Sequence, residues 1–355
     1  MIKIQEYLDN HLEQSLPFVL YAKPNSSVLV GFFQQDYQIY KTANYLQAGF
    51  VFAPFNGADS VLFPVDKCEV LLDSIADLQI NRTDFTDKLP SQATQKKHLD
   101  LVEKGVAAIL RGDFKKVVLS RKETLFIEDP NFMLYFKRLL TTYPTAFRYL
   151  FFHPQVGIWM GASPEQLLKQ KGNYIETVAL AGTQVKSEIS EVQWSEKEKD
   201  EQKIVTDYIL KNLEPFISEL EISQPYTAQA GTLFHIKTDI KAKLSQTNYF
   251  VHALMALHPT PALCGYPKQA ATNFILNHEG YDREFYAGFL GELNCNPETK
   301  QDTESEIFVN LRCMQLEYKK VHLYIGGGIT AQSNPEAEFI ETVNKTKTIK
   351  KILGT

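Results

Sequence analysis

Residues 335–353, PEAEFIETVNKTKTIKKIL, predict a closing helix, and they end the segment from residue 286 onward that decides the expected fold. Two or three strands are expected before this helix. Gly326, Gly327 and Gly328 are expected to form a turn after one of them.

The closing helix carries two carboxylates and an ammonium on one face. Glu338, Glu341 and Lys345 stand at positions i, i+3 and i+7, within roughly 60° of one another around the helix axis. This spacing suits a metal ion and an anionic ligand, although a run of charges usually marks a solvated face. The apolar residues expected to anchor the helix to a sheet fall on another sector: Phe339, Ile340 and Val343.

The composition is that of an ordinary globular protein. Of 355 residues, 44% are hydrophobic and 22% charged, so a large core can form. A net charge of -5 argues against a general nucleic-acid or anionic-membrane binder, but it leaves room for a basic cleft. No apolar run approaches the roughly 20 residues of a membrane span, and residues 1–17 do not resemble a signal peptide. The cysteines lack CxxC spacing, which indicates reduced thiols in a cytoplasm: Cys68, Cys264, Cys295 and Cys313.

The first 90 residues read as a strand-rich portion without a chemical motif. Short apolar runs at 18–23, 27–33, 49–55 and 60–65 predict strands punctuated by Gly, Pro, Asn and Asp. A polar stretch, 78–95, is the best candidate for a linker or long surface loop. We therefore expect residues 1–90 to be the N-terminal portion of one fold and 91–355 to be its catalytic region.

Two residues in the next part of the chain could carry acid–base chemistry. In the strand predicted over 115–127, Lys116 shares a face with Val118 and Ser120. It is either an edge lysine that discourages aggregation or a base aimed into a cleft. Glu165 closes the run Gly-Ala-Ser-Pro-Glu, and it is either a solvated turn acid or a general acid in a cleft wall.

A helix predicted over 195–213 carries an unusual carboxylate. Ser195 and Glu198 form a capping box, and Glu201 lies in line with the buried apolar stripe, where a carboxylate is costly unless it is paired or bound to a metal. Helix ends, however, often expose such positions. Before this helix, Gly182 ends a strand and allows a ligand close to the backbone. His235, in the strand of 232–244, is more often a satisfied core residue than a ligand.

Arg312 lies among apolar residues of a predicted strand, IFVNLRCMQLEY, and needs a partner such as a carboxylate ligand. Pooled with Lys345, it suits a small dicarboxylate. Carboxylates without His or Cys partners suit a hard cation such as Mg²⁺. These residues therefore favour a Mg²⁺-dependent enzyme that acts on a small dianion.

From about residue 94 onward the chain resembles the chorismate-utilising enzymes. The motifs that carry the resemblance occur in the family order: KVVLSR (116–121), GASPE (161–165), LAGT (180–183), SEKEKDE (195–201), HPTPALCGYPKQAA (258–271), YDREFYAG (281–288), LRC (311–313), GGGI (326–329) and PEAEFIETVNK (335–345). The resemblance implies an α+β fold, an α/β sandwich of stacked antiparallel sheets with helices outside. The HPTPAL segment is similar to that of the isochorismate synthase branch.

What the resemblance implies about the site is specific. Lys116 would be the base that activates water for attack at C2 of chorismate, and Glu165 the acid that protonates the departing C4 hydroxyl. Glu201 and Glu341 would bind Mg²⁺, with Glu338 nearby. The substrate-binding positions would be Gly182, Thr183, His235, Ala262, Leu311, Arg312, Gly326 and Lys345. The expected partner is the small molecule chorismate, with no nucleic acid and no membrane, and the chain is expected to be a monomer.

Other activities within and outside the family stay open. A salicylate synthase would share Lys116 and the acids, and an ammonia-dependent anthranilate or aminodeoxychorismate synthase would share the fold. A binding protein without activity is disfavoured because Lys116 and every catalytic-type carboxylate are present. Both a menaquinone and a siderophore pathway are compatible with an isochorismate product.

Overall fold

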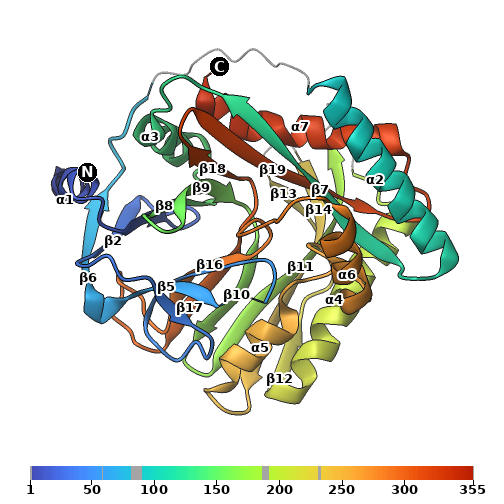
Figure 1. Cartoon of the computed structure of the whole chain (residues 1–355). Coiled ribbons are helices and arrows are strands. Elements are labelled where there is room, and N and C mark those ends of the chain that lie inside the picture. The colour runs from blue at the N-terminus through green and yellow to red at the C-terminus, as the bar shows by residue number, and fades with distance from the viewer. Residues whose placement is uncertain (1, 58, 81–89, 186–191, 231–232, 355) are drawn as a thin grey trace.

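The computed structural model describes residues 2–57, 59–80, 90–185, 192–230 and 233–354. Within them the strands form two sheets in which every pairing is antiparallel, and the helices lie around the outside (Figure 1). The predicted fold class, an α+β sandwich of stacked antiparallel sheets, is therefore confirmed.

The nine-stranded sheet contains, in spatial order, β15 (Gly265–Tyr266), β7 (Lys116–Phe126), β19 (Lys320–Ile329), β18 (Cys313–Glu317), β9 (Gly157–Ser163), β8 (Phe147–His153), β1 (Phe18–Ala22), β2 (Val28–Gln34) and β6 (Cys68–Ser74). The ten-stranded sheet contains β12 (Ile217–Ile222), β14 (Leu233–Leu244), β11 (Tyr174–Val185), β10 (Gln166–Lys171), β17 (Glu304–Val309), β16 (Phe289–Leu293), β4 (Gly49–Ala53), β5 (Ser60–Pro64) and β3 (Tyr40–Thr42), with β13 (Tyr226–Ala230) paired to β14. Strands before residue 90 thus enter both sheets, while the division of the chain at residue 90 stays a prediction.

Seven α-helices are described: α1 (Ile2–Glu13), α2 (Gln92–Arg111), α3 (Phe132–Thr142), α4 (Glu196–Leu213), α5 (Tyr249–Leu257), α6 (Lys268–His278) and α7 (Pro335–Leu353). The predicted capping box of α4 is present, with the Ser195 side chain accepting from the Glu198 N–H. None of the helices in the described ranges has the length and apolar character required to cross a membrane.

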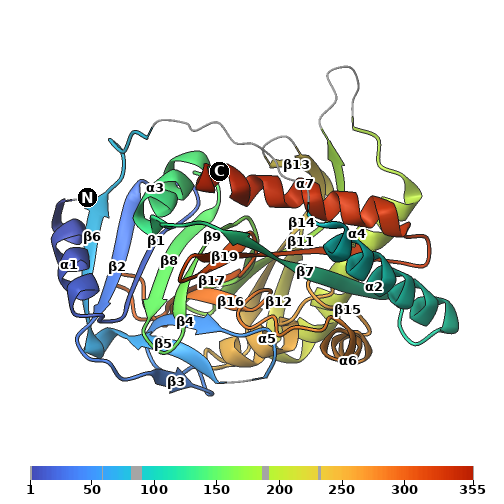
Figure 2. The ribbon, with the colours of Figure 1, turned by 45° about the horizontal axis from the view of Figure 1, so that its top comes forward.

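The main core lies between the two sheets and is rich in aromatic rings. Phe147 of β8 stacks on Phe308 of β17 with ring centroids 4.3 Å apart, and Phe52 of β4 lies 4.5 Å from Phe151 of β8. These contacts join strands of different sheets. A second apolar cluster lies between the nine-stranded sheet and the helices α1, α3 and α7, so this sheet is covered on both faces (Figure 2).

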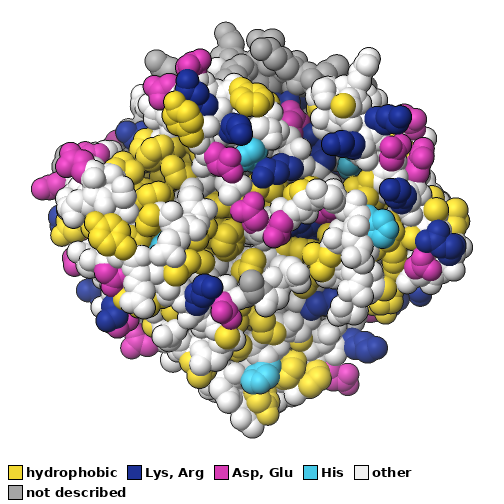
Figure 3. Space-filling view, viewed as in Figure 1, with side chains coloured by type: hydrophobic (Ala, Val, Ile, Leu, Met, Phe, Trp, Pro, Cys, Tyr) yellow, Lys and Arg dark blue, Asp and Glu magenta, His cyan; other side chains and the backbone are white. Residues whose placement is uncertain are grey.

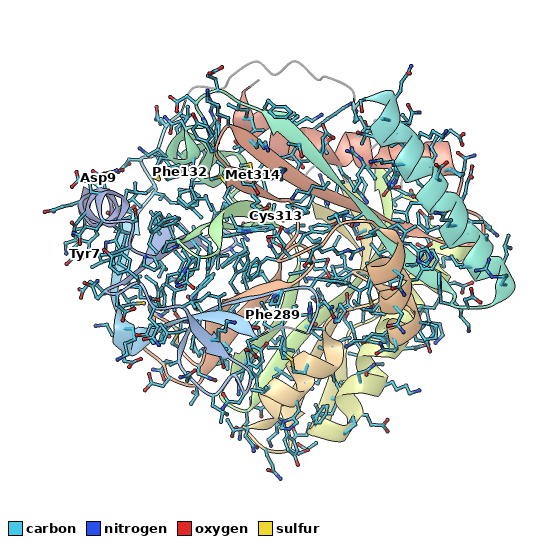
Figure 4. The ribbon with its side chains drawn as sticks, viewed as in Figure 1. Tyr7, Asp9, Phe132, Phe289, Cys313 and Met314 are labelled. Carbon is cyan, nitrogen blue, oxygen red and sulfur yellow. The ribbon has the colours of Figure 1, made fainter. Side chains whose placement is uncertain are left out.

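Two strand pairs pass from one sheet to the other at the same place. The chain leaves β9 at Ser163 and enters β10, in the other sheet, at Gln166; it leaves β17 at Val309 and enters β18 at Cys313. The expected single strand IFVNLRCMQLEY is therefore wrong. Its backbone turns at Arg312, whose φ is 49°, because the strand has to change sheets there. Figure 4 labels Cys313 and Met314, the first residues of β18, in the middle of the molecule.

The glycine triplet also differs from expectation. Gly326, Gly327 and Gly328 lie inside β19 and pair with Ser120, Leu119 and Val118 of β7. They do not form a turn, because the period-2 ladder continues through them to Ile329. The segment after residue 286 contains four strands, more than the two or three expected.

Replacing Phe147 with alanine tests the aromatic contact between the sheets. The ring is 1% exposed, so its loss leaves a cavity and is expected to lower the free energy of unfolding by about 3–5 kcal/mol. Phe126→Ala is the control, since that ring is 79% exposed and its removal should change stability by less than about 0.5 kcal/mol. Urea denaturation measures both, and equal effects would contradict a core centred between the sheets.

Candidate active site

The candidate site is built on the part of β19 formed by Gly326, Gly327 and Gly328, which is called the glycine strand below. Strand β18 pairs with β19 only over Lys320–Leu323, so beyond that point the edge of β19 faces the crossover that carries Arg312. A β-carbon on Gly328 would stand 3.0 Å from Cε and 3.5 Å from Nζ of Lys116. One on Gly327 would stand 3.4 Å from Oε2 of Glu338 and 4.0 Å from Oε1 of Glu341. The bare backbone therefore lets groups approach from both faces of the sheet.

Helix α7 brings the charged face formed by Glu338, Glu341 and Lys345 to this strand. The Lys345 ammonium donates a hydrogen bond to the Gly326 carbonyl at 3.0 Å and pairs with Glu341 at 2.6 Å. The Glu338 carboxylate accepts a hydrogen bond from Ser333 Oγ at 2.7 Å. The charged face of Glu338, Glu341 and Lys345 is therefore turned toward β19. Of the apolar anchors, Phe339 and Val343 are buried as expected, but Ile340 is 52% exposed, because it lies on the outer side of the helix.

Glu165 and Arg312 come from the two crossovers and lie close together. The Glu165 carboxyl is only partly accessible and densely surrounded by protein, and this burial raises its pKa to about 7. The Arg312 guanidinium and the Lys116 ammonium act in the opposite direction, so both cations lie near this carboxyl. A group with this pKa holds its proton to near-neutral pH, as a general acid has to.

The positions on β11 and β14 that were expected to bind substrate meet near the same cations. His235 Nδ1 lies 3.0 Å from the Gly182 carbonyl oxygen. Burial lowers the pKa of His235, and Arg312 and Lys345 lower it further, so the imidazole is neutral at pH 7 and lies in a positive field. Gly182 has a φ of 71° at an irregularity of the β11–β14 ladder. The side chain of Thr183 lies outside the described residues.

The remaining expected positions are distributed around this group. Ala262 precedes a segment that pairs with β7, where Val118 N–H donates to the Cys264 carbonyl at 2.8 Å. Leu311 is half-buried beside Arg312. Glu201 is half-buried on α4, one turn after Glu198, and it makes no described contact with the other site residues.

One further residue at the site was not singled out from the sequence. A β-carbon on Gly326 would stand 2.9 Å from the hydroxyl oxygen of Tyr286, and burial raises the pKa of Tyr286. Tyr286 lies in the YDREFYAG motif between Phe285 and Ala287. In such an apolar run a tyrosine has the pattern of a core residue. Only the folded structure shows that its hydroxyl reaches Gly326, forty residues later in the chain.

The carboxylates offer donor chemistry that fits Mg²⁺. Among the described residues, no three or more His, Cys, Asp or Glu side chains form a cluster able to hold a metal ion. Mg²⁺, however, keeps several waters and needs only one or two protein carboxylates besides the oxygens of a substrate. The Glu341 side chain is 51% exposed and so is accessible to such a cation.

The face of the molecule shown in Figure 3 agrees with the weak overall charge. Lysine, arginine, aspartate and glutamate side chains are interspersed over the face shown in Figure 3. On this face the described side chains form no continuous basic stripe. The cations Lys116 and Arg312 lie near Glu165, and Lys345 lies near Arg312, so positive charge is gathered at the candidate site, where it suits a small anion.

Comparisons with known proteins agree with this fold. A family model described as "Chorismate binding enzyme" matches residues 38–354. Isochorismate synthase EntC of Escherichia coli (strain K12) is 31% identical over 279 residues, covering 75% of this chain and 68% of the relative. Isochorismate synthase DhbC of Bacillus subtilis (strain 168) is 32% identical over 272 residues, covering 71% and 66%. The solved structure of MenF, the menaquinone-specific isochorismate synthase from Escherichia coli, has a TM-score of 0.77 at 21% identity, over 95% of this chain and 88% of that one.

Two large antiparallel sheets, with Glu165 and Arg312 close together at their crossovers, define the class of protein. The chain belongs to the family of chorismate binding enzymes.

The raised pKa of Glu165 predicts a pH-dependent stability. Between its ordinary pKa of 4.5 and about 7, the folded chain keeps a proton that the unfolded chain loses, so stability falls as pH rises through this window. Glu165→Gln removes this effect. We expect the variant to gain about 1–3 kcal/mol relative to the parent between pH 5 and pH 8, less than the full shift because the group is partly accessible.

Urea denaturation at several pH values, without divalent cations, measures this difference. Glu176→Gln is the control, since that side chain is 47% exposed. A constant difference between Glu165→Gln and the parent across this pH range would contradict the raised pKa.

Proposed function

We propose that this protein is a Mg²⁺-dependent isochorismate synthase, an isomerase that converts chorismate to isochorismate. The observation that carries the proposal is Glu165, a carboxyl with a pKa of about 7 beside Arg312 and Lys116. The reaction needs one group that accepts a proton and another that donates one. The two named relatives are isochorismate synthases, which supports the same assignment.

In the proposed mechanism, the Lys116 ammonium first releases a proton to solvent. The neutral amine then accepts a proton from a water molecule whose oxygen forms a bond to C2 of chorismate. The ring double bonds shift, and the C4–O bond breaks. Glu165 donates its proton to the departing hydroxyl, which leaves as water. One water is added and one is lost, so the product is an isomer. Lys116 then releases its proton and Glu165 regains one before the next turnover.

The other residues bind and orient the substrate in this proposal. Arg312 and Lys345 offer cations to one carboxylate of the dianion, and the backbone around Gly326 lets that carboxylate approach closely. Gly182, Thr183, His235, Ala262 and Leu311 form the remaining contacts. Glu201 and Glu341, with Glu338 beside them, would hold Mg²⁺. When bound, the ion would neutralise and orient the other carboxylate of the substrate.

All four cysteines are free thiols in the structure, and free thiols are usual in a reducing compartment. We propose that the enzyme works in the cytoplasm, as a monomer.

Lys116→Ala tests the proposed base. With chorismate and Mg²⁺ in excess, we expect isochorismate formation to fall by about 10²–10⁴-fold, and Glu165→Gln to cause a loss in the same range. Chromatography of the products measures the rate and identifies the product. Lys115→Ala is the control. Lys115 directly precedes Lys116, but it is exposed and lies outside the proposed site.

The same chromatograms separate the rival activities. Salicylate with pyruvate, formed without an added lyase, would replace the proposal by a salicylate synthase. An aminated ring formed only with ammonia would replace it by an ammonia-dependent synthase. Near-full turnover by Lys116→Ala would refute the proposed role of this lysine.

Glu341→Gln tests the proposed metal site. Loss of a negative oxygen ligand is expected to raise the Mg²⁺ concentration for half-maximal rate by at least about tenfold. A Mg²⁺ titration at saturating chorismate measures this shift. Glu336→Gln, an exposed glutamate in the first turn of the same helix, should leave the titration unchanged. Equal titrations for Glu341→Gln and the parent would remove Glu341 from the ligand set.

A further inference from the structure

Helix α7 has a buried charged group on the side that faces β7. Arg121 Nη1 donates to Glu123 Oε2 at 2.6 Å, and Lys350 of α7 pairs with Glu123 Oε1 at 2.7 Å. The side chains of these three residues are 5%, 8% and 2% exposed. Arg121 was expected on the face of the strand opposite Lys116, and it lies there, so these charges are separate from the proposed catalytic pair.

Arg121 also contacts α7 directly, next to the carboxylates. Its Nε donates to Thr342 Oγ1 at 2.8 Å, and its guanidinium lies 5.5 Å from the centre of the Phe339 ring. Thr342 directly follows Glu341, and Phe339 directly follows Glu338. Arg121 therefore holds the same helical turn that presents both carboxylates to β19.

The two faces of α7 are linked by rigid helix geometry. At about 100° per residue, the face of Phe339 and Thr342 lies about 100° from that of Glu338 and Glu341, since each residue of the first pair directly follows one of the second. A rotation of about 10° moves an atom 5–6 Å from the axis by about 1 Å. A misplacement of this size in a catalytic site can reduce the rate by about 10²-fold.

Stability alone does not account for a buried charged triad. Removing charges from water costs several kcal/mol per ion, and apolar side chains of similar volume often replace such groups without loss of stability. The network instead gives geometry, because the planar guanidinium forms directed bonds to Thr342 and Glu123 at once. A purely apolar contact would leave the helix freer to rotate.

We propose that Arg121 is a positioning residue that fixes the rotation of α7 and thereby the placement of Glu338, Glu341 and Lys345 for the metal and the substrate. This inference rests on the proposed function. It extends the site to a residue of β7 that contacts α7 beside the carboxylates and touches neither the substrate nor the cation.

The test uses Arg121→Met, which keeps much of the side-chain volume and removes the directed bonds. Mn²⁺ is the probe, and its binding to the full chain without substrate is followed by electron paramagnetic resonance. We expect the dissociation constant for Mn²⁺ to rise by about 10–100-fold, the range seen when groups that orient ligands are removed. With Mg²⁺ present, we also expect KM for chorismate to rise.

Lys350→Met is the matched control. It breaks the same buried triad but leaves the contacts of Arg121 with Thr342 and Phe339, and it lies nine residues, about 13 Å, beyond Glu341 along the helix. We expect it to lower the unfolding midpoint while the Mn²⁺ dissociation constant stays within about twofold of the parent. If Arg121→Met does not fold, Arg121→Lys takes its place, since a lysine keeps the charge and loses the planar fork; a smaller shift in the same direction is expected.

Three results would overturn the inference. The first is an Arg121 variant that binds Mn²⁺ and chorismate like the parent and loses only stability. The second is a Lys350→Met shift as large as that of Arg121→Met, and the third is a parent that does not bind Mn²⁺. Failure of the proposed function gives a different result, since the parent would then bind Mn²⁺ without converting chorismate.

Discussion

Two backbone hydrogen bonds join the points where the chain passes between the sheets, and the site depends on them. The Val309 N–H donates to the Glu165 carbonyl at 3.0 Å, and the Ala162 N–H donates to the Arg312 carbonyl at 3.2 Å. The strands on either side belong to long ladders, so neither crossover can shift without breaking many bonds. The positive φ of Arg312 is unfavourable for a non-glycine residue and persists because these ladders fix it.

This constraint explains the electrostatics of the cleft. A carboxyl on an open loop would be hydrated and ionised, whereas Glu165 is surrounded by both sheets, and burial outweighs the two cations beside it. Burial also opposes the charge on Lys345 and lowers its pKa, with Glu341 acting in the opposite direction. The site therefore holds cations that lack full hydration, which is unfavourable for stability and would favour the dianion of the proposed function.

The sequence predicted those features that depend on local order. The face of Glu338, Glu341 and Lys345, the capping box of α4 and the alternation of β7 follow from helix and strand periods, and all three are present. The paths of the chain between sheets were not predictable in this way. An apolar run through Arg312 has the pattern of one strand whether or not it changes sheets, and three glycines look like a turn unless their partner strand is known. Tyr286 was missed for the same reason, because its role depends on a neighbour forty residues later.

The glycine strand and helix α7 show how one element can serve a site through two faces. The three glycines at 326–328 leave this part of β19 without side chains. Lys116 therefore approaches it from one face and Glu338 from the other. A strand of this kind cannot hold the approaching groups by packing, since it offers no side-chain surface. Their positions have to be set by other contacts of the elements that carry them. For α7 those contacts are the hydrogen bond of Arg121 to Thr342 and the packing of its guanidinium on Phe339, which makes a buried charge on β7 part of the geometry of the cleft.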